Sequence, residues 1–342
     1  MILSMISNPN ICNKKWIYEQ FDHEVGIRTV LKPGFSDSSV LKLDNEKFIS
    51  CTLDGNSKHC YIDPYNGTLG ILSESIRNTI CVGATPIGIV DHLQFGNPEN
   101  EQIFWTFLES IRAIRDFCKI MKIPVVGGKV SLYNEIKNGP IKPSPVIGAL
   151  GIINNKKSIR SVNTQENDSI FIIGLTAEEM GGSEYYEYHC KIIGGKVPIV
   201  NLKDQLKILN TIKCILNKNL ASAIHDCSKG GFIIALLELS IQCNLGFNID
   251  IGKIPTTCKR IDYILFSESH NRFILSTKFP SKIKNILKEH NIPFANIGNI
   301  MQNKDCNIKF LEKTITTFNL SEIAEKYDNS LSNYLQKDSN II

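Results

Sequence analysis

The pattern of apolar and polar positions divides the chain into two parts in which short strands alternate with helices. In the first part, helical spacing predicts one helix over residues 70–81 and another that begins at an N-cap, Asn100. The second helix is predicted to turn five residues inward: Phe104, Phe107, Leu108, Ile111 and Cys118. Short apolar runs predict buried strands at 86–90, 124–126 and 146–153.

Residues 154–167 are polar and basic without any periodicity, and we expect a domain boundary there. Beyond this segment the pattern restarts with strands near 170–174 and 221–225 and with helices near 203–216, after Gly231 and at 281–290. The alternation predicts an α/β or α+β protein with layered sheets and helices. The predicted segments are a lead-in at 1–29, an N-terminal domain at 30–155, a C-terminal domain at 165–312 and a tail with one weak helix at 313–342.

Composition indicates a globular protein and gives no electrostatic reason to expect nucleic acid or a membrane as a partner. The 342 residues are 42% hydrophobic and 21% charged, and the net charge of +4 is small for this length. The 11 cysteines include no Cys-x-x-Cys pair, which favours reduced thiols over disulfides or a zinc site. The apolar N-terminus is too short for a signal peptide, and no uncharged run approaches the length of a membrane span. We therefore expect a cytoplasmic protein.

The first candidate for chemistry is an apolar run that ends in two glycines, a lysine and a serine. Residues 124–135 read PVVGGKVSLYNE, and a strand followed by a glycine loop can bring backbone N–H groups to a phosphate. Val130 stands where a Walker A loop needs Ser or Thr, so that motif is excluded. For this stretch alone, a tight turn between two strands is the favoured interpretation.

Two further groups of polar residues could hold a magnesium ion or a phosphate. Glu74 and Asn78 lie four residues apart on one face of a predicted helix, and their oxygens suit Mg²⁺. Spacing alone favours a solvated polar face instead. Asp226 and Ser228 precede a helix N-terminus, which favours a phosphate, although an aspartate cap is an equal alternative. His225 is not expected to form a dyad with Asp226, because adjacent side chains of an extended segment point to opposite faces.

Two weaker candidates remain. Asp91 follows the strand predicted at 86–90, where ligands of α/β proteins usually lie, but a loop with helix caps gives the same pattern. Ser-Glu-Ser at 267–269, ahead of Arg272, could form a substrate loop or an exposed turn with a charge pair. There is no Ser/His/Asp constellation, no HExxH motif and no dinucleotide fingerprint. The residues alone therefore indicate a two-domain α/β protein that could hold a Mg-nucleotide at glycine-lined loops.

Five segments taken together resemble the second half of the phosphoribosylformylglycinamidine synthase (PurL) family. They are WIYEQFDHEV, NPENEQIFWTFLESI, PVVGGKVSLYNE, HDCSKGGFIIALLELS and LFSESHNRFIL. The family is a tandem duplication of a two-domain module similar to aminoimidazole ribonucleotide synthetase (PurM). The resemblance implies a mixed-sheet N-terminal domain, a C-terminal α/β domain and a C–N bond-forming ligase of de novo purine synthesis. The implied reaction phosphorylates the formamide oxygen of formylglycinamide ribonucleotide with ATP, and ammonia then displaces the phosphate.

Position by position, the resemblance implies ATP contacts at Asp91 and Gly128 and a contact to the ribonucleotide substrate at Ser131. Lys129 falls where separate-subunit members have a metal-binding Asn and where large single-chain members tend to have Lys. A lysine ammonium cannot coordinate a metal, so a ligand at this position is in doubt. An auxiliary nucleotide, ADP with Mg²⁺, is implied as well, with metal ligands at Asp37, Glu74, Asn78 and Asp226 and a nucleotide contact at Ser228.

The resemblance also implies partners, because the family's catalytic histidine, most of its substrate contacts and two Mg²⁺ carboxylates lie in the first half of the full-length protein. Met1 falls close to the join between the halves, and no catalytic residue is assigned to this chain. The expected partners are a separate N-terminal half, a PurQ-like glutaminase subunit and a small PurS-like bridging subunit. The alternatives are an ADP-binding scaffold half and an inactive split-gene fragment. Selenophosphate synthetase or thiamine-phosphate kinase is the weakest alternative.

Overall fold

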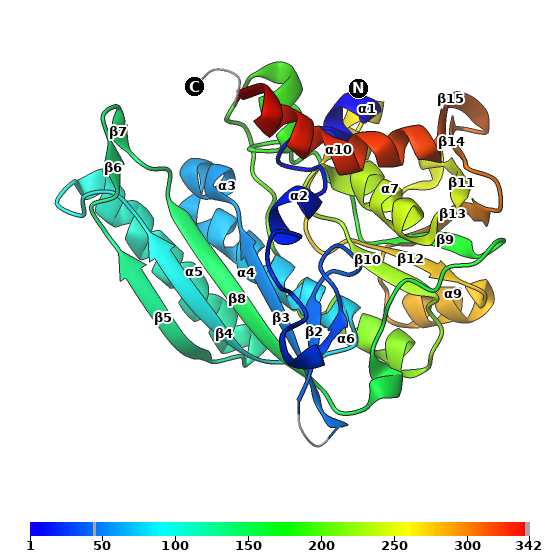
Figure 1. Cartoon of the computed structure of the whole chain (residues 1–342), viewed down its shortest axis with the longest axis horizontal. Helices are drawn as coiled ribbons and strands as arrows, with labels where there is room; N and C mark the ends of the chain where they lie inside the picture. The colour runs from blue at the N-terminus through cyan, green and yellow to red at the C-terminus, as the bar shows by residue number, and fades with distance from the viewer. Residues whose placement is uncertain (44–45, 339–342) are drawn as a thin grey trace.

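Two mixed β-sheets, each covered by helices, make up the structure, a computed structural model that describes residues 1–43 and 46–338 (Figure 1). In the first sheet, β4 (Thr85–Gln94) and β5 (Val125–Ser131) run parallel to each other. All other pairs of neighbouring strands in this sheet are antiparallel. The order of the first sheet is β1 (Thr29–Leu31), β2 (Ser39–Lys42), β3 (Phe48–Gly55), β8 (Ser144–Ile153), β4 and β5. A small ribbon of β6 (Glu135–Ile136) and β7 (Gly139–Pro140) follows β5 in the chain.

The first sheet is covered by α3 (Ser57–Ile62), α4 (Pro64–Cys81) and α5 (Glu101–Met121). The helix predicted over 70–81 is confirmed but begins earlier than expected. Asp63 accepts a hydrogen bond from the backbone N–H of Asn66, and the fixed φ of the following proline suits the first helical turn.

The predicted start of α5 is confirmed, but most of its predicted inward face is wrong. The side chain of Asn100 accepts hydrogen bonds from the backbone N–H groups of Gln102 and Ile103. Ser110 accepts a hydrogen bond from Thr68 of α4, and the residues buried on α5 are Thr106, Ser110, Ala113, Ile114 and Phe117. Three residues predicted to be buried are exposed: Phe104, Leu108 and Ile111.

The second sheet carries helices on both faces. Ile170 and Ile172 of β9 (Ser169–Ile173) point to a cluster with α7 (Gly231–Cys243). Phe171 and Ile173 point to a cluster with α6 (Leu202–Asn217) and α9 (Pro280–Glu289), because successive side chains of a strand point to opposite faces. The order of this sheet is β10 (Ala223–Asp226), β12 (Phe273–Thr277), β9 (Ser169–Ile173), β13 (Phe294–Met301), β11 (Gly246–Asp250), β14 (Asp305–Phe310) and β15 (Lys313–Asn319). Its helices are α6 (Leu202–Asn217), α7 (Gly231–Cys243), α8 (Ile261–Phe266), α9 (Pro280–Glu289) and α10 (Leu320–Asp338).

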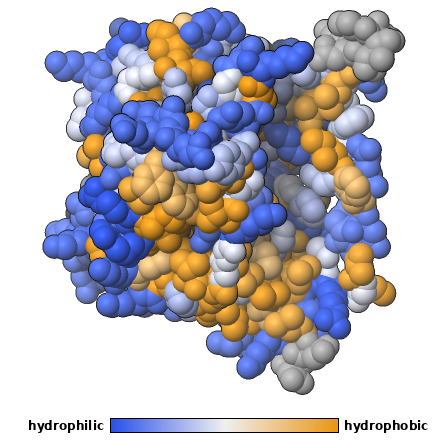
Figure 2. Space-filling view, turned by 90° about the vertical axis from the view of Figure 1, so that its left-hand side faces the viewer, coloured by the Kyte–Doolittle hydropathy of each residue, from blue (hydrophilic) through white to orange (hydrophobic). Residues whose placement is uncertain are grey.

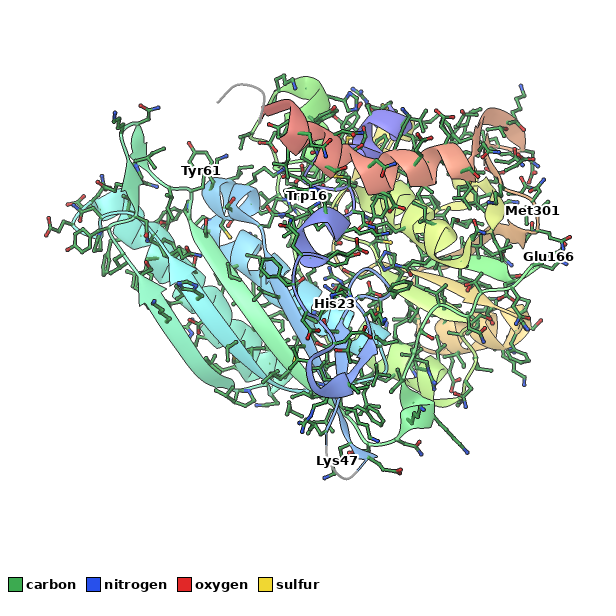
Figure 3. The ribbon with its side chains drawn as sticks, in the orientation of Figure 1. Trp16, His23, Lys47, Tyr61, Glu166 and Met301 are labelled. Atoms are coloured by element: carbon green, nitrogen blue, oxygen red, sulfur yellow. The ribbon has the colours of Figure 1, made fainter. Side chains whose placement is uncertain are left out.

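Both ends of the chain contribute to the second layer. β15 lies within the predicted tail and pairs antiparallel with β14, and α10 is longer than the weak helix expected there. At the other end, α1 (Ile2–Ile6) buries its apolar residues in the same cluster as α7 and α10. The chain then crosses to β1 through α2 (Lys15–Tyr18), and Figure 3 labels Trp16 on this helix and His23 between it and β1.

The two layers share a continuous hydrophobic cluster. α6 packs its apolar residues both against α4 and α5 and against one face of the second sheet.

The boundary predicted at 154–167 lies between β8 and β9. All 11 cysteines are free, and nine of the 11 thiols have a raised pKa, chiefly because of burial. Among the described residues, no helix combines the length and apolarity needed to cross a bilayer.

Candidate functional site

A buried polar cluster lies where α4 of the first layer meets β10 of the second. Nε and Nη2 of Arg77 donate hydrogen bonds to Oδ1 and Oδ2 of Asp226 at 2.5 and 3.0 Å, and Nη1 donates to Ser73 Oγ at 2.5 Å. Arg77 and Asp226 are both almost completely buried. The aspartate-cap interpretation of Asp226 is therefore wrong, because Gly230 occupies the N-cap of α7 and Asp226 pairs with an arginine that the sequence analysis did not identify.

Three more residues with side-chain oxygens, Asp54, Glu74 and Asn78, lie beside this ion pair. Asn78 Nδ2 donates to Oδ1 of Asp54 at 2.9 Å, and the other carboxylate oxygen of Asp54 is buried without a hydrogen-bond partner. Burial and the charges of Asp54 and Asp226 raise the pKa of Glu74 to about 8, while burial and Asp226 raise the pKa of Asp54 to about 6. Glu74 and Asn78 thus lie in a domain interface, and the expectation of a solvated polar face is wrong.

Asp37 reaches the same cluster from the turn before β2. Its Oδ1 lies 2.6 Å from His225 Nδ1 and accepts the backbone N–H of Asp226 at 3.1 Å. The Nε2 atom of His225 lies 3.0 Å from Glu238 Oε2 on α7. Burial alone would lower the pKa of His225, but Asp37 and Glu238 outweigh it and raise this pKa well above its usual value. His225 and Asp226 have different side-chain partners, which confirms that they form no dyad. We call Asp37, Asp54, Glu74, Arg77, Asn78 and Asp226 the interdomain cluster.

The residues expected to contact ATP and substrate lie apart from the interdomain cluster, on β4 and β5. Asp91 and Gly128 are opposite each other in the parallel ladder, and a Cβ on Gly128 would stand 2.7 Å from Oδ1 of Asp91. β5 continues through both glycines, so the favoured tight turn and the alternative glycine loop are both wrong. The Asp91 carboxyl has a raised pKa because it is partly buried. Lys129 is exposed on β5, and Ser131 at its end accepts a hydrogen bond from Asn134 Nδ2 at 3.2 Å.

Ser228 and the segment at 267–269 adjoin the start of α7. Ser228 is partly buried in the turn before α7, where its carbonyl accepts the backbone N–H of Gly231 at 3.0 Å. Residues 267–269 are buried, and Arg272 donates to the carbonyls of Ser267 and Ser269 rather than pairing with Glu268. The interpretation of this segment as an exposed turn with a charge pair is therefore wrong.

Glu268 holds the glycine turn before α7. Its Oε1 accepts backbone N–H groups of Glu184 and Gly230, each at 2.9 Å, and its Oε2 lies 3.6 Å from His59 Nε2. Burial and the nearby charge of Glu184 raise the pKa of Glu268 to about 7. Burial lowers the pKa of His59 to about 3, so this imidazole is neutral at pH 7.

The interdomain cluster suits a magnesium ion that also binds a phosphate. In the described ranges 1–43 and 46–338, no three His, Cys, Asp or Glu side chains are arranged to hold a metal by themselves. Mg²⁺, however, usually takes only one or two carboxylates and completes its shell with phosphate oxygens and water. Glu74 and Asp54 supply carboxylate oxygens of this kind. Oδ2 of Asp54 is buried and accepts no hydrogen bond, so a cation would supply the partner that this oxygen lacks. Asp226 is already paired with Arg77, which makes it the weakest of the expected ligands.

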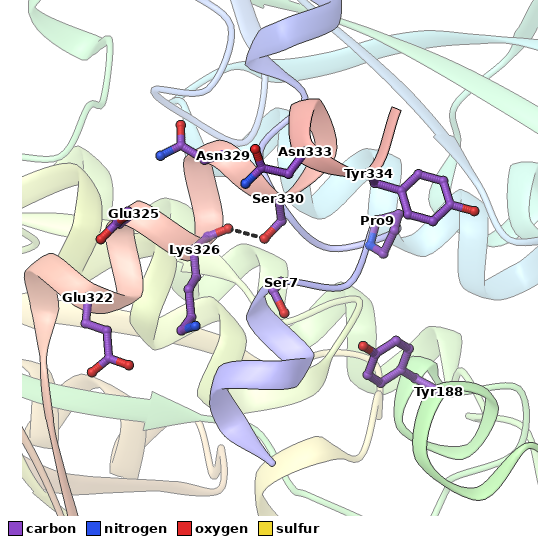
Figure 4. A pocket seen from close by; sticks show the side chains of 10 residues that line it. All are labelled: Ser7, Pro9, Tyr188, Glu322, Glu325, Lys326, Asn329, Ser330, Asn333 and Tyr334. Atoms are coloured by element: carbon purple, nitrogen blue, oxygen red, sulfur yellow. Dashed lines mark hydrogen bonds between the residues drawn. The ribbon is translucent and has the colours of Figure 1, made fainter. Parts of the chain in front are cut away.

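A surface hollow of about 540 Å³ lies elsewhere, between α10, the segment after α1 and the π-helix Tyr186–Cys190 (Figure 4). Tyr188 and Tyr334 stand at one end of this hollow, and Glu322 and Lys326 stand at the other. None of the residues expected to bind a ligand lines it. The candidate chemistry therefore lies in the interdomain cluster and on β4 and β5 rather than in this hollow.

Comparison with known proteins decides the family. Residues 35–153 match the N-terminal domain, and residues 165–310 the C-terminal domain, of AIR synthase related protein. The chain belongs to this family. The resemblance to PurL and the mixed two-domain fold are confirmed by the relatives and by the two domain matches.

Its curated relatives are described as phosphoribosylformylglycinamidine synthase subunit PurL. The PurL of Methanothermobacter marburgensis is 40% identical over 300 residues, covering 87% of this chain and 42% of its own length. For Methanocaldococcus jannaschii, identity is 38% over 337 residues, with coverages of 96% and 45%. The chain thus spans less than half the length of these relatives. The crystal structure of phosphoribosylformylglycinamidine synthase II from Thermotoga maritima has a TM-score of 0.77 at 18% identity, covering 94% of this chain and 51% of that one.

Proposed function

We propose that the chain is one half of a phosphoribosylformylglycinamidine synthase and works with a separate N-terminal half. The observation that carries this proposal is 38% identity across 96% of the chain to a PurL subunit of which it spans only 45%. The complete enzyme would convert formylglycinamide ribonucleotide, ATP and ammonia to formylglycinamidine ribonucleotide in purine biosynthesis. This activity would place the chain in the cytoplasm.

An apolar face on the first layer supports a large partner. Figure 2 looks onto the side of the molecule that carries β5 and α5, and hydrophobic residues gather there. β5 is an edge strand of the first sheet, and unpaired edges of this kind are normally covered. The residues of this apolar face are between 39% and 61% exposed: Phe104, Trp105, Leu108, Ile111, Val125, Val126 and Val130. An exposed patch of this kind is typical of a protein interface, and the N-terminal half is the partner that we assign to it.

Two nucleotide sites are part of the proposal. Solved structures of Thermotoga maritima PurL that share this fold are complexes with ATP, with ADP and with FGAR. We assign the auxiliary ADP and its Mg²⁺ to the interdomain cluster, where Asp37, Glu74, Asn78 and Asp226 would supply oxygens and Ser228 would contact the nucleotide. When bound, the ion would neutralise phosphate charge. The reacting ATP would contact Asp91 and Gly128, the ribonucleotide would contact Ser131, and Lys129 would supply no metal ligand.

Delivery of ammonia is assigned to other subunits. A structure described as PurLQS from Thermotoga maritima has a TM-score of 0.71 with this chain, at 19% identity. By analogy, a PurQ-like glutaminase and a PurS-like bridging subunit would join the two halves.

Reconstitution tests the proposal. The chain is purified with the N-terminal segment of an archaeal PurL relative, and amidine formation is measured with formylglycinamide ribonucleotide, MgATP and ammonium chloride. We expect turnover only when both halves are present, and glutamine should replace ammonium once PurQ and PurS are added. A folded complex that binds Mg-ADP without turnover would support the scaffold alternative. A folded chain that binds neither the partner half nor Mg-ADP would support the inactive-fragment alternative.

A further inference from the structure

His225 lies between two carboxylates that come from distant parts of the chain. Its Nδ1 lies 2.6 Å from Asp37 Oδ1, before β2, and its Nε2 lies 3.0 Å from Glu238 Oε2, on α7. An ionised carboxylate can only accept hydrogen bonds, so both ring nitrogens of His225 donate. A ring that donates at both ends has its orientation fixed by both partners.

The contacts of Asp37 leave one of its oxygens available for a ligand. His225 and the backbone N–H of Asp226 both donate to Oδ1. Within the described ranges, no hydrogen bond to Oδ2 is present. The Asp37 side chain is only 7% exposed, so it has little freedom to turn toward solvent. The two donors therefore set the direction of the remaining oxygen.

Glu238 is itself braced by the C-terminal helix. The hydroxyl of Tyr327 on α10 donates to Oε1 of Glu238 at 3.3 Å, while His225 occupies Oε2. A hydrogen-bonded chain thus runs from Tyr327 through Glu238 and His225 to Asp37. Groups that hydrogen-bond to a metal-binding side chain typically change metal affinity by about 10- to 100-fold when they are removed.

We infer that His225 and Glu238 are positioning residues that orient Asp37 toward a divalent cation carrying a nucleotide phosphate. This inference rests on the proposed function, because it assumes that the interdomain cluster binds Mg²⁺ with ADP. It adds two residues that neither the sequence analysis nor the comparisons assign. Neither residue is expected to touch the cation or the nucleotide.

Two substitutions of His225 separate positioning from packing. The amide nitrogen of an asparagine takes the place of Nδ1, so His225→Asn can keep the hydrogen bond to Asp37 and loses the one to Glu238. The amide nitrogen of a glutamine takes the place of Nε2, so His225→Gln keeps Glu238 and loses Asp37. Glutamine is closer to histidine in size, so a packing role would favour His225→Gln.

The readout is the Mg²⁺ concentration that gives half of the maximal rise in melting temperature at saturating ADP, measured on the purified chain. We expect His225→Gln to raise this concentration about tenfold or more and His225→Asn to raise it less. Glu238→Gln, which can still accept from Nε2, should stay close to wild type, whereas Glu238→Ala, which keeps the contact of His225 with Asp37 and loses the one with Glu238, should follow His225→Asn. Melting temperatures without ligand and far-UV circular dichroism establish that each variant is folded.

The outcomes distinguish this inference from the proposed function. If wild type responds to Mg-ADP and both His225 variants need the same Mg²⁺ concentration as wild type, the inference is overturned and the nucleotide site stands. If His225→Asn needs a higher Mg²⁺ concentration than His225→Gln, the effect arises from packing. This result also overturns the inference. If wild type shows no Mg²⁺-dependent response to ADP, the auxiliary site fails and the inference fails with it.

Discussion

Arg77 on α4 and Asp226 on β10 form a buried, bidentate ion pair that joins the two layers of the molecule. Removing one partner of such a pair leaves a charge in a dry interior, which costs about 3–5 kcal/mol. We therefore expect Arg77→Met to lower the free energy of unfolding by about that amount in urea denaturation. Adding Asp226→Asn to this variant should recover part of the loss, because it removes the orphaned charge.

An exposed ion pair provides the control. Lys253 and Glu312 are paired at 2.9 Å, with side chains 48% and 71% exposed. Lys253→Ala should change the free energy of unfolding by less than about 1 kcal/mol, as is usual for surface pairs. If Arg77→Met costs no more than Lys253→Ala, the two layers do not depend on the buried pair.

Gly128 and its neighbour Gly127 offer a matched pair of substitutions on β5. A Cβ on Gly128 would meet the Asp91 carboxyl at 2.7–2.9 Å, whereas a Cβ on Gly127 would find Val90 Cγ1 at 3.8 Å, an ordinary contact. Gly128→Ala should displace the Asp91 side chain and lower ATP-dependent turnover of the reconstituted enzyme by at least about tenfold, or about 1.4 kcal/mol of transition-state stabilisation. Gly127→Ala should retain most of the activity. Equal losses in both variants would show that Asp91 is not the affected group.

Helix α5 and strand β5 show how much of the fold a single sequence can predict. The helix after Asn100 was predicted from its cap and period, but its buried face was not, because apolar residues occur on both sides of it and the tight contact with α4 uses Thr106 and Ser110. For the strand through Gly127 and Gly128 the sequence favours a tight turn, because glycines are typical of turns and the space taken by Asp91 is visible only in three dimensions.

The interdomain cluster was predicted only in part. Glu74 and Asn78 share a helix face, which local spacing reveals, and the resemblance supplied Asp37 and Asp226. Arg77 lies on the same helix, yet nothing in its neighbourhood along the chain indicates a partner 149 residues away. The sequence does not reveal the place of Asp54 in the cluster either, because a carboxylate before a turn normally faces solvent. Such contacts depend on how the two layers pack, and periodicity carries no information about that.

Glu268 should make the stability of the chain depend on pH between its unfolded and folded pKa values. Its pKa is raised from 4.5 to about 7 by burial and by Glu184, so the folded state holds a proton that the unfolded state releases. The folded state binds more protons in this interval, and the free energy of unfolding should fall as pH rises from about 4.5 to about 7. Above this interval the contribution should level off.

Glu268→Gln tests this dependence directly. Glutamine can accept from the backbone N–H groups of Glu184 and Gly230 and, like a protonated carboxyl, donate toward the neutral ring of His59. We expect urea unfolding of this variant to vary less with pH between about 4.5 and 7 than wild type. The exposed Glu289 serves as the control, and Glu289→Gln should keep the wild-type profile. An unchanged profile in Glu268→Gln would mean that other groups carry the dependence.

The part of the apolar face that lies on α5 should matter for assembly and not for folding. Leu108 is 44% exposed, so a charged replacement neither opens a cavity nor buries a charge in the free chain. Leu108→Glu should therefore change the free energy of unfolding by no more than about 0.5 kcal/mol. If the N-terminal half covers this face, the same variant should weaken its binding by at least about 30-fold, because a buried, unpaired carboxylate costs about 2 kcal/mol or more.

Leu311, which is 67% exposed and lies after β14 in the other layer, provides a matched control. Affinities of wild type, Leu108→Glu and Leu311→Glu for the N-terminal half can be compared by sedimentation velocity at one salt concentration. We expect only Leu108→Glu to dissociate, because it alone lies on the apolar face. Tight binding by Leu108→Glu would instead exclude α5 from the interface and leave the edge of β5 as the remaining apolar surface to test.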